Sequence, residues 1–142
     1  MEGTVESGDK IELVDDNILN NEEFKKDLEG KYSMIEVIVQ ENSGMGSANN
    51  KGIKLCETNY AFVINPDVKF YNNTMQELID FSAKNNDYSI LAPISDDIKY
   101  PNYKNTNKSK VTNELAYLSV DSVDGFAMLI NKRKFKDNLY FD

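Results

Sequence analysis

Histidine is absent from this sequence, and cysteine occurs once, at Cys56. Without histidine, the chain cannot form the usual zinc sites or any catalytic pair of serine or cysteine with histidine. A single cysteine cannot form a disulfide within the chain, and Cys56 is most simply a small core residue. Acid–base chemistry is therefore left to carboxylates, lysine and tyrosine.

The sequence also lacks long apolar runs and an excess of basic residues. No segment approaches the roughly 18 apolar residues that a transmembrane helix requires, and the polar residues 1–10 contain no stretch typical of a secretion signal. The net charge of −8 and the pI near 4.6 argue against a broad nucleic-acid surface, which needs clustered lysine and arginine. We therefore expect a soluble intracellular protein with a small charged ligand, without a transmembrane segment or a nucleic-acid partner.

Short apolar runs alternate with helical patterns up to Pro93. The 142 residues suit a single domain with one core. Strands are predicted at 11–14, 35–39, 60–64 and 88–92, and helices at 22–29, at 47–57 and from Thr74 onward. In the last helix, Thr74 and Glu77 predict a capping box, and Met75, Leu78, Ile79 and Ser82 recur at helical spacing. This alternation predicts an α/β fold with a mostly parallel sheet flanked by helices.

The pattern changes after Pro93. Residues 96–112 show little periodicity and predict a long surface loop. Two apolar runs, 115–123 and 126–130, then predict an antiparallel strand pair around Asp124-Gly125. The glycine has a second interpretation, because a residue without a side chain also lets a ligand approach the backbone.

The segment Asn42-Ser-Gly44-Met-Gly46 lies between a predicted strand and a predicted helix. Two glycines there allow amides to face outward, and the helix start adds unpaired N–H groups and a positive dipole end. This combination suits a diphosphate, although two glycines are equally consistent with a tight turn that binds nothing. A third glycine or a Gly-Lys-Ser/Thr sequence is missing, which argues against dinucleotide-binding and P-loop motifs.

Two acidic positions follow predicted strands. Asp67, in Asn65-Pro66-Asp67, is suited to hold a divalent cation against a diphosphate, although the same tripeptide is ordinary turn chemistry. Asp15 and Asp16 could accept hydrogen bonds from a base or ribose, or could simply end a strand.

Taken together, these motifs resemble the family 2 glycosyltransferases with a GT-A fold, especially their rhamnosyltransferase-like branch. The similarity covers about residues 11–142, after the polar segment 1–10. The matching stretches are Val14-Asp15-Asp16-Asn17, the block from Asn42 to Gly52 with Asn49, Val63-Ile-Asn-Pro-Asp67-Val68, Ile90-Leu-Ala-Pro93, Val123-Asp124-Gly125-Phe-Ala-Met-Leu-Ile130 and Tyr140-Phe141-Asp142.

This resemblance implies a glycosyltransferase that moves a sugar, with inversion, from a nucleoside-diphosphate sugar to a saccharide or lipid-linked acceptor in cell-surface polysaccharide synthesis. It implies a divalent metal, Mg²⁺ or Mn²⁺, at Asp67, and a nucleotide base at Asp15 or Asp16. The remaining implied donor-site residues are Asn42, Gly44, Gly46, Asn49, Asp124 and Gly125. The implied location is cytoplasmic, including the inner face of the membrane as a peripheral protein.

Two departures from the family pattern matter. The usual first strand with its nucleotide-holding turn is missing from residues 1–10, and the Glu-Asp segment that supplies the general base is expected beyond Asp142. The chain is therefore expected to be a fragment of a GT-A domain that lacks its catalytic base. The alternative is a non-catalytic nucleotide-binding or assembly module, which could form oligomers through an exposed sheet edge.

Overall fold

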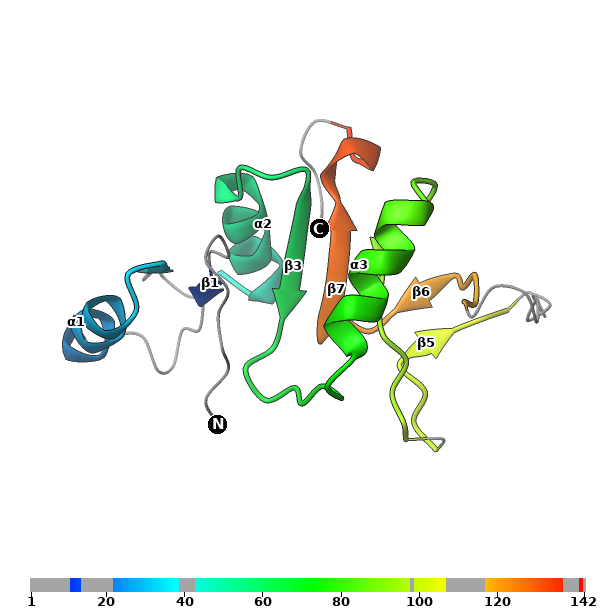
Figure 1. Ribbon diagram of the computed structural model, residues 1–142, viewed down its shortest axis with the longest axis horizontal. Helices are drawn as coiled ribbons and strands as arrows, with labels where there is room; N and C mark the ends of the chain where they lie inside the picture. Colours follow the sequence, from blue (N-terminus) through cyan, green and yellow to red (C-terminus); the bar gives the residue numbers. More distant parts are fainter. Residues whose placement is uncertain are drawn as a thin grey trace. The chain divides into compact units, whose positions relative to one another are not determined.

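The computed structural model describes residues 11–13, 22–38, 43–97, 99–106, 117–136 and 141. Its residues divide into two units, and Figure 1 shows their helices and strands coloured along the chain. Unit 1 comprises Met1–Glu57 and Asn138–Asp142, and unit 2 comprises Thr58–Asp137. The domain predicted over residues 11–142 spans both units and stays a prediction.

Unit 1 contains a βαβ arrangement, as the sequence predicts. Strand β1 (Ile11–Leu13) pairs in parallel with β2 (Ile35–Val37), and helix α1 (Glu22–Lys31) connects them. The Glu29 carboxylate accepts a hydrogen bond from the backbone N–H of buried Val37, at 3.0 Å, and so ties the helix to the strand. Helix α2 (Met45–Leu55) follows and buries Ala48 and Ile53.

Unit 2 is built around a three-stranded sheet. Strand β7 (Ala127–Asn131) lies between β3 (Tyr60–Ile64) and β4 (Ile90–Leu91) and is antiparallel to both. Four of the five β7 side chains are buried, which explains the continuous apolar run because a central strand is covered on both faces. Helix α3 (Thr74–Lys84) joins β3 to β4, and a separate pair is formed by β5 (Tyr103–Lys104) and β6 (Ser122–Val123).

This topology brings three strand ends to one edge of the sheet. Because β7 is antiparallel to β3 and β4, its first residue lies beside the last residue of β3, and Ala127 is in register with Ile64. We call this edge, where β3 and β4 end and β7 begins, the carboxyl edge. In doubly wound α/β folds, ligands bind outside the carboxyl ends of the strands.

The strand pairings differ in part from those predicted. The described residues contain one parallel pair, β1–β2, and three antiparallel pairs, so they do not form a mostly parallel sheet. The predicted hairpin between 115–123 and 126–130 is wrong in its pairing, because β6 pairs with β5 while β7 pairs with β3 and β4. The two strands nearest the C-terminus, β6 and β7, do form antiparallel pairs. Their partners, however, are β5 for β6 and β3 and β4 for β7, and not each other.

Helix α3 also differs from its predicted details. Thr74 is the first helical residue and Asn73 is the N-cap, and the Asn73 side chain forms no capping hydrogen bond. The predicted capping box requires Thr74 as the N-cap, so it does not form. The buried face contains Leu78, whereas Met75 is 39% and Ile79 is 53% exposed. Among the described residues, no helix combines the length and apolar character needed to cross a membrane.

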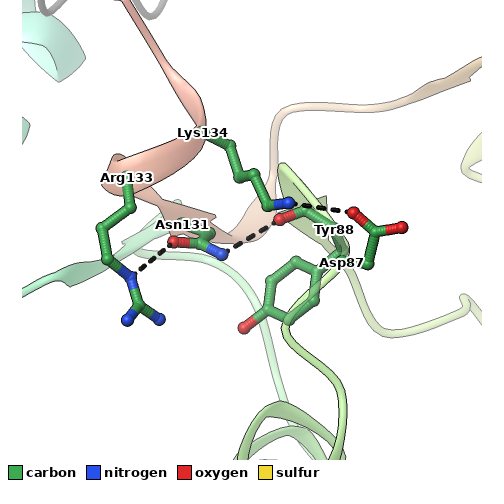
Figure 2. A network of polar contacts seen from close by, with 5 residues as sticks. All are labelled: Asp87, Tyr88, Asn131, Arg133 and Lys134. Atoms are coloured by element: carbon green, nitrogen blue, oxygen red, sulfur yellow. Dashed lines mark hydrogen bonds and ion pairs between the residues drawn. The ribbon is translucent and has the colours of Figure 1, made fainter.

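The buried side chain of Asn131 lies at the opposite end of β7, and Figure 2 shows its polar contacts. Asn131 donates a hydrogen bond to the Tyr88 carbonyl at 3.1 Å, and its Oδ1 accepts from Nε of Arg133 at 3.5 Å. Nearby, Lys134 forms an ion pair with Asp87 at 2.9 Å. The basic residues Lys132-Arg-Lys134 form a short 3₁₀ helix, η1 (Lys132–Lys134), which carries Arg133 and Lys134.

Replacing Asn131 by leucine should destabilise unit 2 by about 1–3 kcal/mol, because the part-buried Tyr88 carbonyl loses the hydrogen bond from the buried Asn131 side chain. Urea denaturation followed by circular dichroism measures this loss. Asn72→Leu is the matched control, because Asn72 is exposed and its replacement should change stability by less than about 0.5 kcal/mol. Equal stability of the two variants would contradict the structural role of Asn131.

Candidate functional site

The turn after β3 carries Asp67 at the carboxyl edge. The Val68 amide donates to the Asn65 carbonyl at 3.2 Å, which closes the turn Asn65-Pro66-Asp67-Val68. Pro66 restricts Asn65 to an extended conformation and helps the chain leave the strand here. The side chain of Asp67 is exposed, so its carboxylate is accessible to a ligand at the carboxyl edge.

Asp124 and Gly125 lie at the same edge as Asp67. They immediately precede Phe126 and β7, and the Phe126 carbonyl accepts a hydrogen bond of 2.8 Å from the Asn65 amide. One backbone hydrogen bond therefore joins the Asp67 turn to the segment that carries Asp124 and Gly125. The structure brings the segments that carry these three sequence-predicted site residues to one edge of the sheet.

Asn102 organises the loops at this edge, and the sequence interpretation missed it. Its buried side chain accepts a hydrogen bond from the Ser95 amide at 2.8 Å and donates one to the Pro93 carbonyl at 2.9 Å. Its backbone carbonyl accepts from the Asp124 amide at 2.8 Å. Asn102 thus links the loop after β4 to Asp124. No periodic pattern around residue 102 marks it, because its role depends on segments distant in the sequence.

A second contact joins the loops after β3 and β4. The Tyr71 hydroxyl donates to the Asp96 carboxylate at 2.6 Å. This hydrogen bond, together with repulsion between the carboxylate and a phenolate, raises the pKa of Tyr71 above its usual 10.0. The contact therefore stabilises the folded state fully at pH values below the unfolded-state pKa of Tyr71. This stabilisation is lost as the pH rises through the higher folded-state pKa.

Asp96→Asn should lower the pKa of Tyr71 toward its usual value, because the substitution removes the negative charge that opposes phenolate formation. The ring ¹³C resonance of Tyr71, followed against pH by NMR, reports this change. Asp97→Asn is the control, since Asp97 is the neighbouring exposed carboxylate and its Oδ1 accepts from the Lys99 amide. A Tyr71 pKa that stays raised in Asp96→Asn would contradict the assigned contact.

The residues at the carboxyl edge fit one kind of metal binding. Among the described residues, no three histidine, cysteine, aspartate or glutamate side chains gather in an arrangement that could hold a metal ion. These residues therefore do not fit a metal site in which protein side chains supply all the ligands. They do fit Mg²⁺ or a similar hard cation, which commonly binds through one or two carboxylates and completes its coordination with substrate phosphates and water. Asp67 would be the protein ligand in such a site.

The turn for which the sequence predicts an anion site lies at the start of α2, in unit 1, and the site itself stays a prediction. Gly44 is the N-cap with φ 90° and ψ 158°, a conformation essentially restricted to glycine. The first helical hydrogen bond runs from Ala48 to Gly44 at 3.2 Å, so the amides of Met45, Gly46 and Ser47 have no partner within the helix. The first turn contains no acidic residue that would repel an anion.

Two details of the glycine-rich block were not foreseen. Gly46 lies inside the first turn of α2 and not in the turn before it, because the helix begins at Met45. Asn49, the predicted ligand contact, is half-buried, whereas the neighbouring Asn50 forms two hydrogen bonds with the backbone of Phe141, at 2.8 and 3.0 Å. The predicted site residues Asp15, Asp16 and Asn42 lie outside the described residues.

Comparison with known families identifies a match over most of the chain. The sequence profile of Glycosyl transferase family 2 matches residues 7–138. Comparisons with curated proteins and with solved structures gave no match. The matched region contains every predicted site residue, from Asp15 to Gly125. The chain therefore belongs to the family 2 glycosyltransferases.

Proposed function

We propose that this chain binds a nucleoside-diphosphate sugar as a donor. The proposed reaction transfers the sugar from this donor, with inversion, to a saccharide or lipid-linked acceptor. The observation that carries the proposal is the hydrogen bond between Asn65 and Phe126, which unites the Asp67 turn with Asp124 and Gly125 at the carboxyl edge. Family membership supports a nucleotide-sugar donor for this edge. The rhamnosyltransferase-like branch and a role in cell-surface polysaccharide synthesis are part of the proposal.

In this proposal Asp67 holds a divalent cation, Mg²⁺ or Mn²⁺, together with the donor diphosphate. When bound, the cation offsets the negative charge that develops on the leaving diphosphate. Exposure of Asp67 supports the role, because the carboxylate needs no rearrangement to reach a ligand. Asp124 and Gly125 are assigned to the donor sugar and the acceptor, since the backbone near a glycine can approach a ligand closely.

The remaining donor contacts are assigned by the family resemblance and by the properties of α2. The amides near Gly44 and Gly46 would donate to diphosphate oxygens, as amides at a helix N-terminus do. Asp15 or Asp16 would accept from the nucleotide base, and Asn42 and Asn49 would border the nucleotide. The proposed location is the cytoplasm, including the inner face of the membrane.

Thermal unfolding tests this function with UDP and dTDP as probes. A ligand at 100 times its Kd stabilises the folded state by about 2.7 kcal/mol, so binding should raise Tm measurably. We expect the rise only when Mn²⁺ and a nucleoside diphosphate are both present. Uridine is the control, because it lacks the diphosphate. An unchanged Tm in every mixture, with a folded sample, would contradict the proposal.

A non-catalytic assembly module is the second candidate. Within the described sheet of unit 2, β3 and β4 are the outer strands and each pairs with β7 only. An outer strand of a sheet can pair with a strand of another chain. Sedimentation separates the two functions, since a stable oligomer without a diphosphate-dependent rise in Tm would favour the module.

A further inference from the structure

Residues 124–126, which we call the site segment, are held by a backbone hydrogen bond at each end. At the C-terminal end, the Phe126 carbonyl accepts from the Asn65 amide in the turn after β3, at 2.8 Å. At the N-terminal end, the Asp124 amide donates to the Asn102 carbonyl, also at 2.8 Å. The two ends of the site segment therefore depend on different loops of unit 2.

The side chain of Asn102 fixes the residue that supplies the second of these bonds. Only 3% of Asn102 is exposed. Its Oδ1 accepts from the Ser95 amide at 2.8 Å, and its Nδ2 donates to the Pro93 carbonyl at 2.9 Å. Any displacement of this side chain would leave partly buried polar groups without a partner, which is costly. The Asn102 carbonyl is therefore presented to Asp124 from a fixed position.

The loop that Asn102 closes has hydrogen bonds of its own. The Asp97 amide donates to Oγ of Ser95 at 3.2 Å. The Lys99 amide donates to the Asp97 carboxylate at 2.9 Å, and the Tyr100 amide donates to the Asp97 carbonyl at 3.2 Å. Asn102 therefore attaches the site segment to a loop that is already organised internally.

We propose that Asn102 is a positioning residue of the donor site, which holds Asp124 and Gly125 in place for the donor sugar. This inference rests on the proposed function, because that function assigns Asp124 and Gly125 to the sugar. Asn102 acts through its bond to the Asp124 amide, whereas Asp67 lies in the turn bonded to the other end of the site segment. Loss of the Asn102 side chain should therefore disturb the sugar end of the site and leave the diphosphate end intact.

Asn102→Leu tests this role, and Asn131→Leu is the matched control. Both asparagines are buried in unit 2 and donate from the side chain to a backbone carbonyl, but Asn131 lies at the other end of β7. A general loss of stability should thus appear in both variants. Hydrogen exchange of the Asp124 amide, followed by NMR, should be at least about fivefold faster in Asn102→Leu than in Asn131→Leu, which corresponds to the loss of about one hydrogen bond.

Mg²⁺ together with UDP or dTDP gives a second measurement, through shifts of backbone amide resonances. In the wild type and in Asn131→Leu, these ligands should shift the amides of Asp67, Asp124 and Gly125. In Asn102→Leu, the Asp67 amide should still shift, while the shifts of Asp124 and Gly125 should be largely lost. A residue with only a structural role would not separate the two ends of the site in this way.

A third measurement uses the wild-type chain and does not depend on how a variant folds. The Ser95 amide, which donates to the buried Asn102 side chain, should exchange at least about tenfold more slowly than the Lys99 amide, relative to their intrinsic rates. The Lys99 amide is the internal reference, because its acceptor is the exposed carboxylate of Asp97.

Three results would overturn the role of Asn102 alone: equal exchange of the Ser95 and Lys99 amides, equal exchange of the Asp124 amide in the two variants, or full ligand shifts at Asp124 in Asn102→Leu. A different result would contradict the proposed function, and the role of Asn102 in donor binding with it. In that result, neither Asp67 nor Asp124 of the wild type responds to Mg²⁺ and nucleotide.

Discussion

Asp67→Asn is expected to weaken Mn²⁺-dependent binding of UDP or dTDP more than about 100-fold, because substitution of groups that only support metal ligands already costs about 10–100-fold. The exposed position of Asp67 predicts a change in folding stability below about 0.5 kcal/mol. Calorimetric titration of the nucleotide, with and without Mn²⁺, measures the first quantity, and urea denaturation measures the second.

Asp80→Asn is the matched control for this substitution. Asp80 is an exposed carboxylate in the same unit, on α3, where it accepts a hydrogen bond from Gln76 at 2.8 Å. The substitution Asp80→Asn removes the same charge as Asp67→Asn, so a general electrostatic effect on nucleotide binding would appear in both variants. Equal nucleotide affinity of Asp67→Asn and wild type would reject Asp67 as the metal ligand.

Gly44→Ala should destabilise unit 1 by about 1–3 kcal/mol, because alanine is strained at φ 90° and ψ 158°. The space around Gly44 is open, so the cost comes from the backbone conformation and not from a steric clash with a distant group. Relief of this strain would shift the start of α2, and we therefore also expect weaker nucleoside-diphosphate binding. Urea denaturation and calorimetry of the same variant measure the two effects.

Gly30→Ala is the control for Gly44→Ala. Gly30 lies in α1, where an added Cβ meets nothing within 4 Å, and its φ is not positive. Alanine should stabilise this helix by about 0.5–1 kcal/mol, because it has the higher helix propensity. If Gly44→Ala were as stable as Gly30→Ala, the assigned conformation of Gly44 would be wrong.

The sequence predicted the order of the main elements well, because each has a local signal. The β-branched run at β2, the apolar run at β3 and the helical spacing in α3 are all visible within ten or so residues. The pairing of β7 was predicted wrongly, since its partners β3 and β4 lie far away along the chain and not in the neighbouring segment 115–123. The short strand β5 was also missed, because the loop that contains it has no alternating pattern.

The candidate site was predictable where a motif marks it. Asp67, Asp124 and Gly125 were chosen from the sequence, and the antiparallel pairing of β3 with β7 explains why their segments meet at one edge. Asn102 was not predictable, because its importance comes from hydrogen bonds to Ser95, Pro93 and Asp124 that only the folded chain assembles.

The most direct test of the account is an NMR titration of the ¹⁵N-labelled chain with UDP or dTDP, in the presence and absence of Mg²⁺. Mg²⁺ and the nucleotide together should shift the backbone amides of Asp67, Val68, Asp124 and Gly125, while the nucleotide alone should shift them much less. Unchanged amide resonances at the carboxyl edge under saturating Mg²⁺ and both nucleotides would contradict the assignment of this edge as the donor site.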